Sequence, residues 1–132
     1  MLLDLLKKLL IGTSARSRYS VSPETEQKIQ MDWENIQVLL KQKSPSQLRH
    51  ALITADKSLD NALRDVMEGE TMGERLKNAK ARFDPVIYNK IWEAHKVRNS
   101  MVHESGYEPP HFVVTEAIEN LRRGLTTLGV RV

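Results

Sequence analysis

The stretch "SPSQLRHALITADKSLDNALRDV", residues 44–66, carries the clearest helical pattern in this 132-residue chain. Ser44 followed by Pro45 is a helix start, because a serine side chain caps the first free N–H groups and proline fits the first helical position. Apolar residues then recur every three or four positions, at Leu48, Leu52, Ala55, Leu59, Leu63 and Val66. This spacing predicts one long helix with a buried stripe, ending before Gly69.

The residues before this stretch repeat the pattern. Ser22 and Pro23 give the same start signal, and the helix is predicted to run to about Lys43. Its apolar stripe consists of Ile29, Trp33, Ile36 and Leu40. Almost nothing separates the two predicted helices, and so short a connection forces two long helices to pack as an antiparallel hairpin.

Two more helices are predicted between residues 71 and 102. Thr71 and Glu74 form a capping-box pattern for a short helix, although a glycine within it weakens the helix propensity. Asp84 and Pro85 begin a long one, whose apolar positions are Ile87, Ile91, Ala94, Met101 and Val102.

The C-terminal part contains a loop and a last helix. One glycine and two prolines make "HESGYEPPHF", residues 103–112, a loop. The last helix is predicted from about Thr115. No segment alternates with the period of a strand. We therefore predict an all-α, up-and-down antiparallel bundle over residues 23–132, with four main helices and one short one.

Residues 1–22 are predicted to form a separate N-terminal region. Asp4, Lys7 and Lys8 interrupt the leucines of residues 1–11 and share one helical face, which predicts an amphipathic helix and argues against a signal peptide. A serine-rich linker follows. Two interpretations stay open, a helix packed on the bundle or a partner protein, and a helix on a membrane surface. We expect a cytoplasmic protein, attached peripherally to a membrane in the second case.

Composition excludes several classes of site. The chain is 40% hydrophobic and 28% charged, as in an ordinary globular domain. It has no cysteine, which excludes a disulfide framework and a cysteine nucleophile. Its histidines, His50, His95, His103 and His111, lack the spacing of metal ligands, so no metal or cofactor is predicted. The net charge of +3 permits RNA binding without predicting it.

The most informative polar segment is "RNSMVH", residues 98–103. Arg98 stands where the stripe of its helix calls for an apolar residue, and burying a guanidinium costs several kcal/mol unless it is paired. His95 shares its face, and Asp56 and Asp60 are the available carboxylates. One interpretation is purely structural: an ion pair between Arg98 and Asp56 orders the bundle, and His103 merely lies near a helix end.

The helix order and four stretches of this chain resemble the HEPN family (higher eukaryotes and prokaryotes nucleotide-binding). The stretches are "RNSMVH", "ALITADKSLDNAL", "TMGERLKNA" and "IWEAHKVRNSMVHE". The HEPN signature is an arginine, usually followed by a polar residue, and a histidine after four to six residues. That spacing alone is expected about once by chance in a chain of this composition. The resemblance covers residues 23–132 and therefore rests on the wider context.

The resemblance implies a metal-independent endoribonuclease that is active as a homodimer on RNA. It assigns Arg98 and His103 as the catalytic pair and Asn99 as an orienting residue. The residue types suit the chemistry, because a guanidinium can bind two phosphorane oxygens and an imidazole can move the proton of a ribose hydroxyl. Such a protein could be a toxin or a defence factor, with a nucleotidyltransferase-type antitoxin as its partner.

Helix geometry limits how these residues can meet. Arg98 and His103 are five residues apart and would point about 140° away from each other on one straight helix. Either the helix ends between them or a second protomer completes the site. A competing interpretation is a catalytically inactive HEPN module that binds a nucleotide or a protein. Trp33, Tyr88 and Trp92 lie on apolar stripes and are predicted to be core residues rather than base-stacking platforms.

Overall fold

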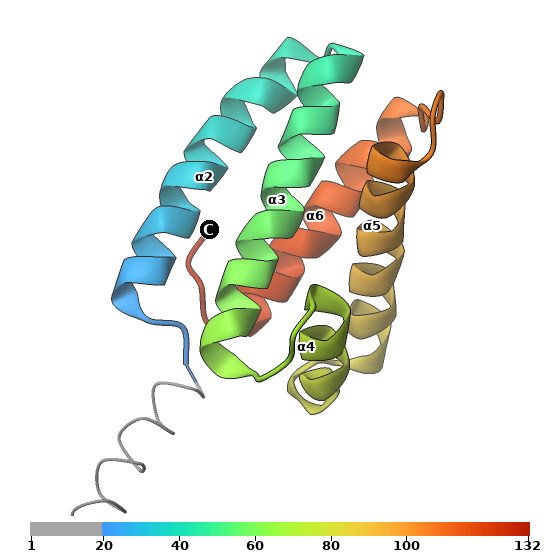
Figure 1. The fold of residues 1–132 in the computed structure, drawn as a ribbon. Coiled ribbons are helices and arrows are strands. Elements are labelled where there is room, and N and C mark those ends of the chain that lie inside the picture. Colours follow the sequence, from blue (N-terminus) through green and yellow to red (C-terminus); the bar gives the residue numbers. More distant parts are fainter. Residues whose placement is uncertain (1–19) are drawn as a thin grey trace, which may run out of the picture.

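A computed structural model describes residues 20–132, which form five α-helices and one short 3-10 helix, without a strand in this range (Figure 1). The elements are α2 (Pro23–Gln42), α3 (Pro45–Val66), α4 (Met72–Asn78), the 3-10 helix (Lys80–Arg82), α5 (Pro85–His103) and α6 (His111–Thr127). The prediction of an all-α fold is confirmed. The amphipathic helix predicted over residues 1–11 and most of its linker lie outside the described residues.

The α2–α3 hairpin forms for the reasons that the sequence indicated. The Ser22 side chain accepts a hydrogen bond from the Thr25 N–H at 3.2 Å, and Ser44 accepts one from the Gln47 N–H at 3.3 Å. The chain reverses at Lys43, whose φ of 58° is left-handed. The two helices consequently lie side by side (Figure 1).

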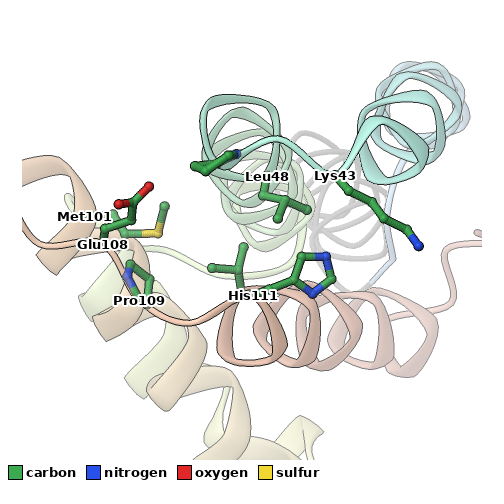
Figure 2. Close-up of a pocket in the computed structure, with 8 residues that line it drawn as sticks. Lys43, Leu48, Met101, Glu108, Pro109 and His111 are labelled. Carbon is green, nitrogen blue, oxygen red and sulfur yellow. The ribbon is translucent and has the colours of Figure 1, made fainter.

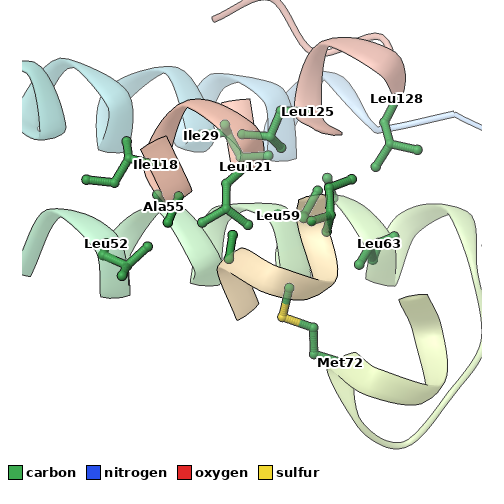
Figure 3. Close-up of a cluster of buried hydrophobic side chains, with 14 of the residues drawn as sticks. Ile29, Leu52, Ala55, Leu59, Leu63, Met72, Ile118, Leu121, Leu125 and Leu128 are labelled. Atoms are coloured by element: carbon green, nitrogen blue, oxygen red, sulfur yellow. The ribbon is translucent and has the colours of Figure 1, made fainter. Parts of the chain in front are cut away.

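α3 is the central element of the core. Its buried side chains run along its whole length and contact α2 on one side and α6 on the other (Figure 3). The fully buried members of this cluster include Ile29, Leu52, Leu59, Leu63, Leu121 and Leu125. Each such side chain contributes about 1.5–3 kcal/mol on burial, so this layer supplies much of the stability of the bundle.

α5 packs mainly against α6 and more lightly against α3. At Gly124 the two helices approach closely, because a Cβ added there would lie 2.8 Å from Cδ1 of Ile91. The absence of a side chain on Gly124 therefore lets Ile91 fill the space between α5, α6 and α3. This packing ties α5 to α6 about two helical turns before Arg98, the first residue of the "RNSMVH" segment.

The short helix α4 is present as predicted. The Thr71 side chain accepts a hydrogen bond from the Glu74 N–H at 3.1 Å, and the Glu74 carboxylate accepts one from the Glu70 N–H at 2.8 Å. The second bond reaches the residue before the cap rather than the cap itself. A Cβ added to Gly73 would lie 3.5 Å from the Trp92 ring of α5, an ordinary contact distance, so the packing does not require a glycine there.

The predicted start of the last helix is wrong by four residues. α6 begins at His111 rather than near Thr115, with Pro110 as its N-cap residue. The pair of prolines was interpreted as part of a loop. Proline lacks only an N–H that the first turn of a helix does not use, so it can precede a helix directly.

The aromatic residues are placed largely as predicted. Trp33 is 4% exposed and Tyr88 is 9% exposed, whereas Trp92 is only partly buried against the core. Within residues 20–132, none of the helices has the length and apolar character needed to cross a membrane.

Candidate active site

Arg98 lies on the side of α5 that faces α3. Its side chain is 29% exposed, and its Nε lies 3.6 Å from Oδ2 of Asp56, a carboxylate that is almost completely buried on α3. The ion pair predicted between these two residues is therefore present. The core-facing position of Arg98 is compatible with its charge because α3 supplies the compensating group there.

His95 binds the same carboxylate. Its Nδ1 lies 3.0 Å and 3.1 Å from the two oxygens of Asp56, and its side chain is mostly buried. A carboxylate only accepts hydrogen bonds, so Nδ1 of His95 carries the proton. The edge of the Trp92 ring packs against the imidazole from one turn earlier on α5. His95 is thereby held in one orientation from two sides.

Asn99 closes these contacts into a ring of four side chains. Its Oδ1 accepts a hydrogen bond from Arg98 at 3.0 Å, and its Nδ2 lies 3.4 Å from Nε2 of His95. Because Nδ1 of His95 carries the proton, Nε2 can accept from the Asn99 amide. Within the ring, Asp56 and His95, His95 and Asn99, and Asn99 and Arg98 are thus joined by donor–acceptor contacts, and an ion pair at 3.6 Å joins Arg98 to Asp56. We call these four residues the α3–α5 polar ring.

The guanidinium of Arg98 is only partly used within this ring. One of its terminal nitrogens donates to Asn99, but its buried Nε has no hydrogen-bond partner among residues 20–132 and lies only at ion-pair distance from Asp56. Buried polar atoms are normally satisfied, and an exception needs a reason. The buried Nε is closed to solvent, so any remaining donor capacity of Arg98 for an anion lies in its terminal nitrogens, on a side chain that is 29% exposed.

Asp60 does not belong to the ring, and the prediction that it helps to compensate Arg98 is wrong. It pairs instead with Arg75, whose Nε donates to Oδ1 of Asp60 at 2.9 Å, and with Arg64 at 3.2 Å. Asp60 lies one helical turn beyond Asp56 on α3, where the facing element is α4. The competing arginine of α4 is closer than Arg98.

Arg75 was not recognised from the sequence as a buried residue, although a signal existed. It is 6% exposed and shares the buried face of α4 with Met72 and Leu76. The spacing of three and four residues that identified Arg98 on α5 also applies to these positions. In a helix of only seven residues the stripe is too short to stand out.

His103 is the last residue of α5 and is exposed, and its side chain makes no hydrogen bond or ion pair with the described residues. The helix does not end between Arg98 and His103, so the two side chains leave α5 about 140° apart. Asn99 lies one turn before His103 on a neighbouring position of the same surface. A single chain therefore assembles Arg98, Asn99, His95 and Asp56, but not His103 with Arg98.

Two adjoining pockets open next to the C-terminal end of α5, beyond the polar ring. One has a volume of about 310 Å³ and lies between the α2–α3 turn, the end of α5 and the start of α6 (Figure 2). The other has a volume of about 400 Å³ and extends along the α5–α6 loop. Both are lined by Pro45, Met101 and Glu108, so they adjoin, and we call the two pockets together the groove.

Within residues 20–132, no three histidine, aspartate or glutamate side chains converge to a cluster that could hold a metal ion. The described site is instead an arginine held by a carboxylate, an imidazole and an amide. Comparison of the chain with protein-family models, curated protein sequences and solved structures gave no match.

Proposed function

We propose that this protein is a HEPN-type, metal-independent endoribonuclease that cleaves RNA at a site shared between two protomers. The observation that carries the proposal is the incomplete use of Arg98: Asp56 and Asn99 hold the guanidinium, yet the side chain is 29% exposed, and within residues 20–132 only one of its terminal nitrogens donates a hydrogen bond. The element order supports the proposal as well, because the arginine and the histidine fall at the end of the penultimate helix, α5.

The proposed reaction is transesterification of the RNA backbone. The ribose 2′-oxygen attacks the adjacent phosphorus, the bond from phosphorus to the 5′-oxygen breaks, and the products carry a 2′,3′-cyclic phosphate and a 5′-hydroxyl. Negative charge builds on the equatorial oxygens during this step, and Arg98 binds them through its fork of N–H donors. His103 transfers the proton of the 2′-hydroxyl, or returns one to the leaving oxygen.

The geometry of α5 favours a contribution from both protomers. Arg98 faces α3, whereas His103 is exposed on another side of the same unbroken helix. In a two-fold dimer the surface of one copy meets the same surface of the other. The proposed site therefore pairs Arg98 of one protomer with His103 of its partner.

The function is tested by incubating the purified protein with unstructured RNA in excess chelator. We expect cleavage to 2′,3′-cyclic phosphate ends and a fall of about 100-fold or more in the rate for Arg98→Ala and for His103→Ala. His50→Ala removes another exposed histidine and serves as the matched control. Absence of cleavage by the wild-type protein at high concentration would contradict the proposal.

The shared site has a separate test. Mixing the two inactive variants forms dimers in which one site retains both wild-type residues. If Arg98 and His103 come from different protomers, mixing Arg98→Ala with His103→Ala protein restores part of the activity. If both come from one chain, every site in the mixture lacks a residue and activity stays at the level of the separate variants.

One observation favours an inactive binding module as the second candidate function. Arg98 is already engaged by two groups of its own chain, Asp56 and Asn99. A residue held in this way can stabilise the bundle without any chemistry. RNA or nucleotide binding without cleavage, together with a loss of stability in Arg98→Ala, is the result expected for such a module.

A further inference from the structure

The groove beyond the polar ring lies close to Arg98 along both helices that form the ring. On α5, Met101 lines the groove and follows Arg98 by three residues, about one helical turn. On α3, Arg49 lines it and precedes Asp56 by seven residues, which places both on one face about 10 Å apart along the axis. The groove therefore lies within about one to two helical turns of the polar ring.

The lining of the groove combines three kinds of side chain. Arg49 is exposed and makes no hydrogen bond or ion pair within residues 20–132. Tyr107, in the α5–α6 loop, is 38% exposed and presents an aromatic surface next to the buried Met101. Glu108 lies at the junction of the two pockets, and within residues 20–132 its side chain has no partner either (Figure 2).

These side chains match the parts of a nucleotide. An arginine binds phosphate oxygens through its planar fork of donors, and a tyrosine ring stacks on a base. A carboxylate repels phosphate but accepts hydrogen bonds from the exocyclic amino groups of bases. The volume of about 400 Å³ lies within the usual range of small-ligand sites.

We propose that this groove binds a nucleotide adjacent to the scissile phosphate of a single-stranded RNA, with its base on Tyr107, its phosphate on Arg49 and its base edge on Glu108. The inference rests on the proposed ribonuclease function and names the form of its substrate. Glu108 favours adenine, cytosine or guanine over uracil, because these three bases offer an exocyclic amino group, whereas the only edge donor of uracil, N3–H, lies between two carbonyl oxygens that the carboxylate repels. Duplex RNA is excluded, because its bases are paired and cannot enter the groove.

Binding is measured by fluorescence anisotropy with 2′-O-methylated uridine octamers that carry one central adenosine, cytidine, guanosine or uridine. These oligonucleotides lack the attacking hydroxyl, so binding is observed without cleavage. The wild-type protein is expected to bind the all-uridine octamer most weakly. Tyr107→Leu is expected to weaken binding of the others about tenfold, whereas Tyr107→Phe retains the ring and the affinity.

The other two variants separate charge from base recognition. Arg49→Ala is expected to weaken all octamers alike and to lower the slope of log affinity against log salt by about 0.7, the value for one phosphate contact of a single strand. Lys57→Ala, which removes an exposed charge from another face of α3, is the control and leaves the slope nearly unchanged. Glu108→Gln is expected to abolish the discrimination against uridine.

The two proposals fail in different ways. Octamer binding that depends on Arg49, Tyr107 and Glu108, in a protein that cleaves no RNA, supports the groove and contradicts the nuclease. The protein could instead cleave RNA while its affinity for the octamers is the same for every base and unchanged in the three variants. This result would contradict nucleotide binding in the groove and leave the nuclease proposal intact. Binding of a peptide in the groove, without binding of any octamer, would also contradict the proposed nucleotide site.

Discussion

Two carboxylates on α3, four residues apart, each hold an arginine, but they do so differently. Asp60 binds Arg75 through Nε and a terminal nitrogen, both at 2.9 Å, and Arg75 donates a third bond to the Gly69 carbonyl at 2.7 Å. Asp56 lies 3.6 Å from Arg98, whose Nε has no hydrogen-bond partner. We call the cluster of Asp60 and Arg75 closed, because every guanidinium nitrogen of Arg75 has a partner. The cluster of Asp56 and Arg98 leaves its arginine incompletely hydrogen-bonded.

The closed cluster depends on a backbone feature that the other lacks. Gly69 has a φ of 151°, and a Cβ added to it would lie 2.8 Å from the backbone nitrogen of Arg75. Only glycine allows the loop before α4 to approach so closely and to present its carbonyl. All three guanidinium nitrogens of Arg75 are therefore engaged within the chain, which is the arrangement of a structural tie between α3 and α4. Within residues 20–132 Arg98 has no such third partner, and this difference is the reason why we propose Arg98, and not Arg75, as the residue that binds a ligand.

The largest effect on stability is expected from Asp60→Ala. Arg75 is 6% exposed and cannot turn its charge to water, so removal of its partner should lower the free energy of unfolding by about 3–5 kcal/mol. Urea denaturation followed by circular dichroism measures the loss. Arg64→Ala removes the exposed partner of the same carboxylate and should change stability by less than about 1 kcal/mol. A loss below about 1 kcal/mol in Asp60→Ala would contradict the structural role.

A smaller loss of stability, but a loss of activity, is expected from Asp56→Ala. The Arg98 side chain is 29% exposed and can reach solvent when its partner is absent, so the stability should fall by only about 1–3 kcal/mol. RNA cleavage should nevertheless fall strongly, because Arg98 and His95 lose their fixed orientation. A greater loss of stability in Asp56→Ala than in Asp60→Ala would reverse the comparison of the two clusters.

Replacing Arg75 or Arg98 by lysine keeps the positive charge but removes the planar set of guanidinium donors. The two substitutions therefore test how many of these donors each site uses. Arg75→Lys gives up donors that reach both Asp60 and Gly69 and should cost about 1–2 kcal/mol in unfolding free energy. Arg98→Lys gives up one hydrogen bond and should cost about 1 kcal/mol or less, while RNA cleavage falls. If both lysine variants lost the same stability and Arg98→Lys still cleaved RNA at the wild-type rate, the distinction between a structural Arg75 and a ligand-binding Arg98 would be wrong.

The smallest effect on stability is expected at the exposed ion pair between Arg122 and Glu119. It serves as a comparison for the two buried clusters. The hydrogen bond from Arg122 lowers the pKa of Glu119 on α6. A carboxyl whose pKa is lower in the folded state stabilises it above the unfolded pKa, and this contribution disappears as the pH falls through the folded pKa. Since the Glu119 side chain is 44% exposed, screening limits the effect to about 0.5 kcal/mol. Glu119→Gln should lower the urea midpoint slightly at pH 7, and this difference from the wild-type protein should shrink as the pH falls below the unfolded pKa.

Local sequence signals predicted most of the helices correctly. Three of their starts follow from a capping side chain, at Ser22, Ser44 and Thr71, and these caps are present. The start of α6 was misplaced because Pro110 gives the same signal for a loop and for the residue before a helix. The position of Arg98 on the core side of α5 was also predictable, because it follows from the helical period alone.

The amino-acid sequence alone thus determined the helices and the faces that they bury, since hydrogen-bonding caps and apolar spacing act over a few residues. Only the tertiary structure decided which carboxylate each arginine meets. Asp56 and Asp60 both lie near the buried stripe of α3, and one helical turn places the first opposite α5 and the second opposite α4. Such a choice depends on the relative positions of whole helices, which the packing of side chains such as Ile91 against Gly124 sets.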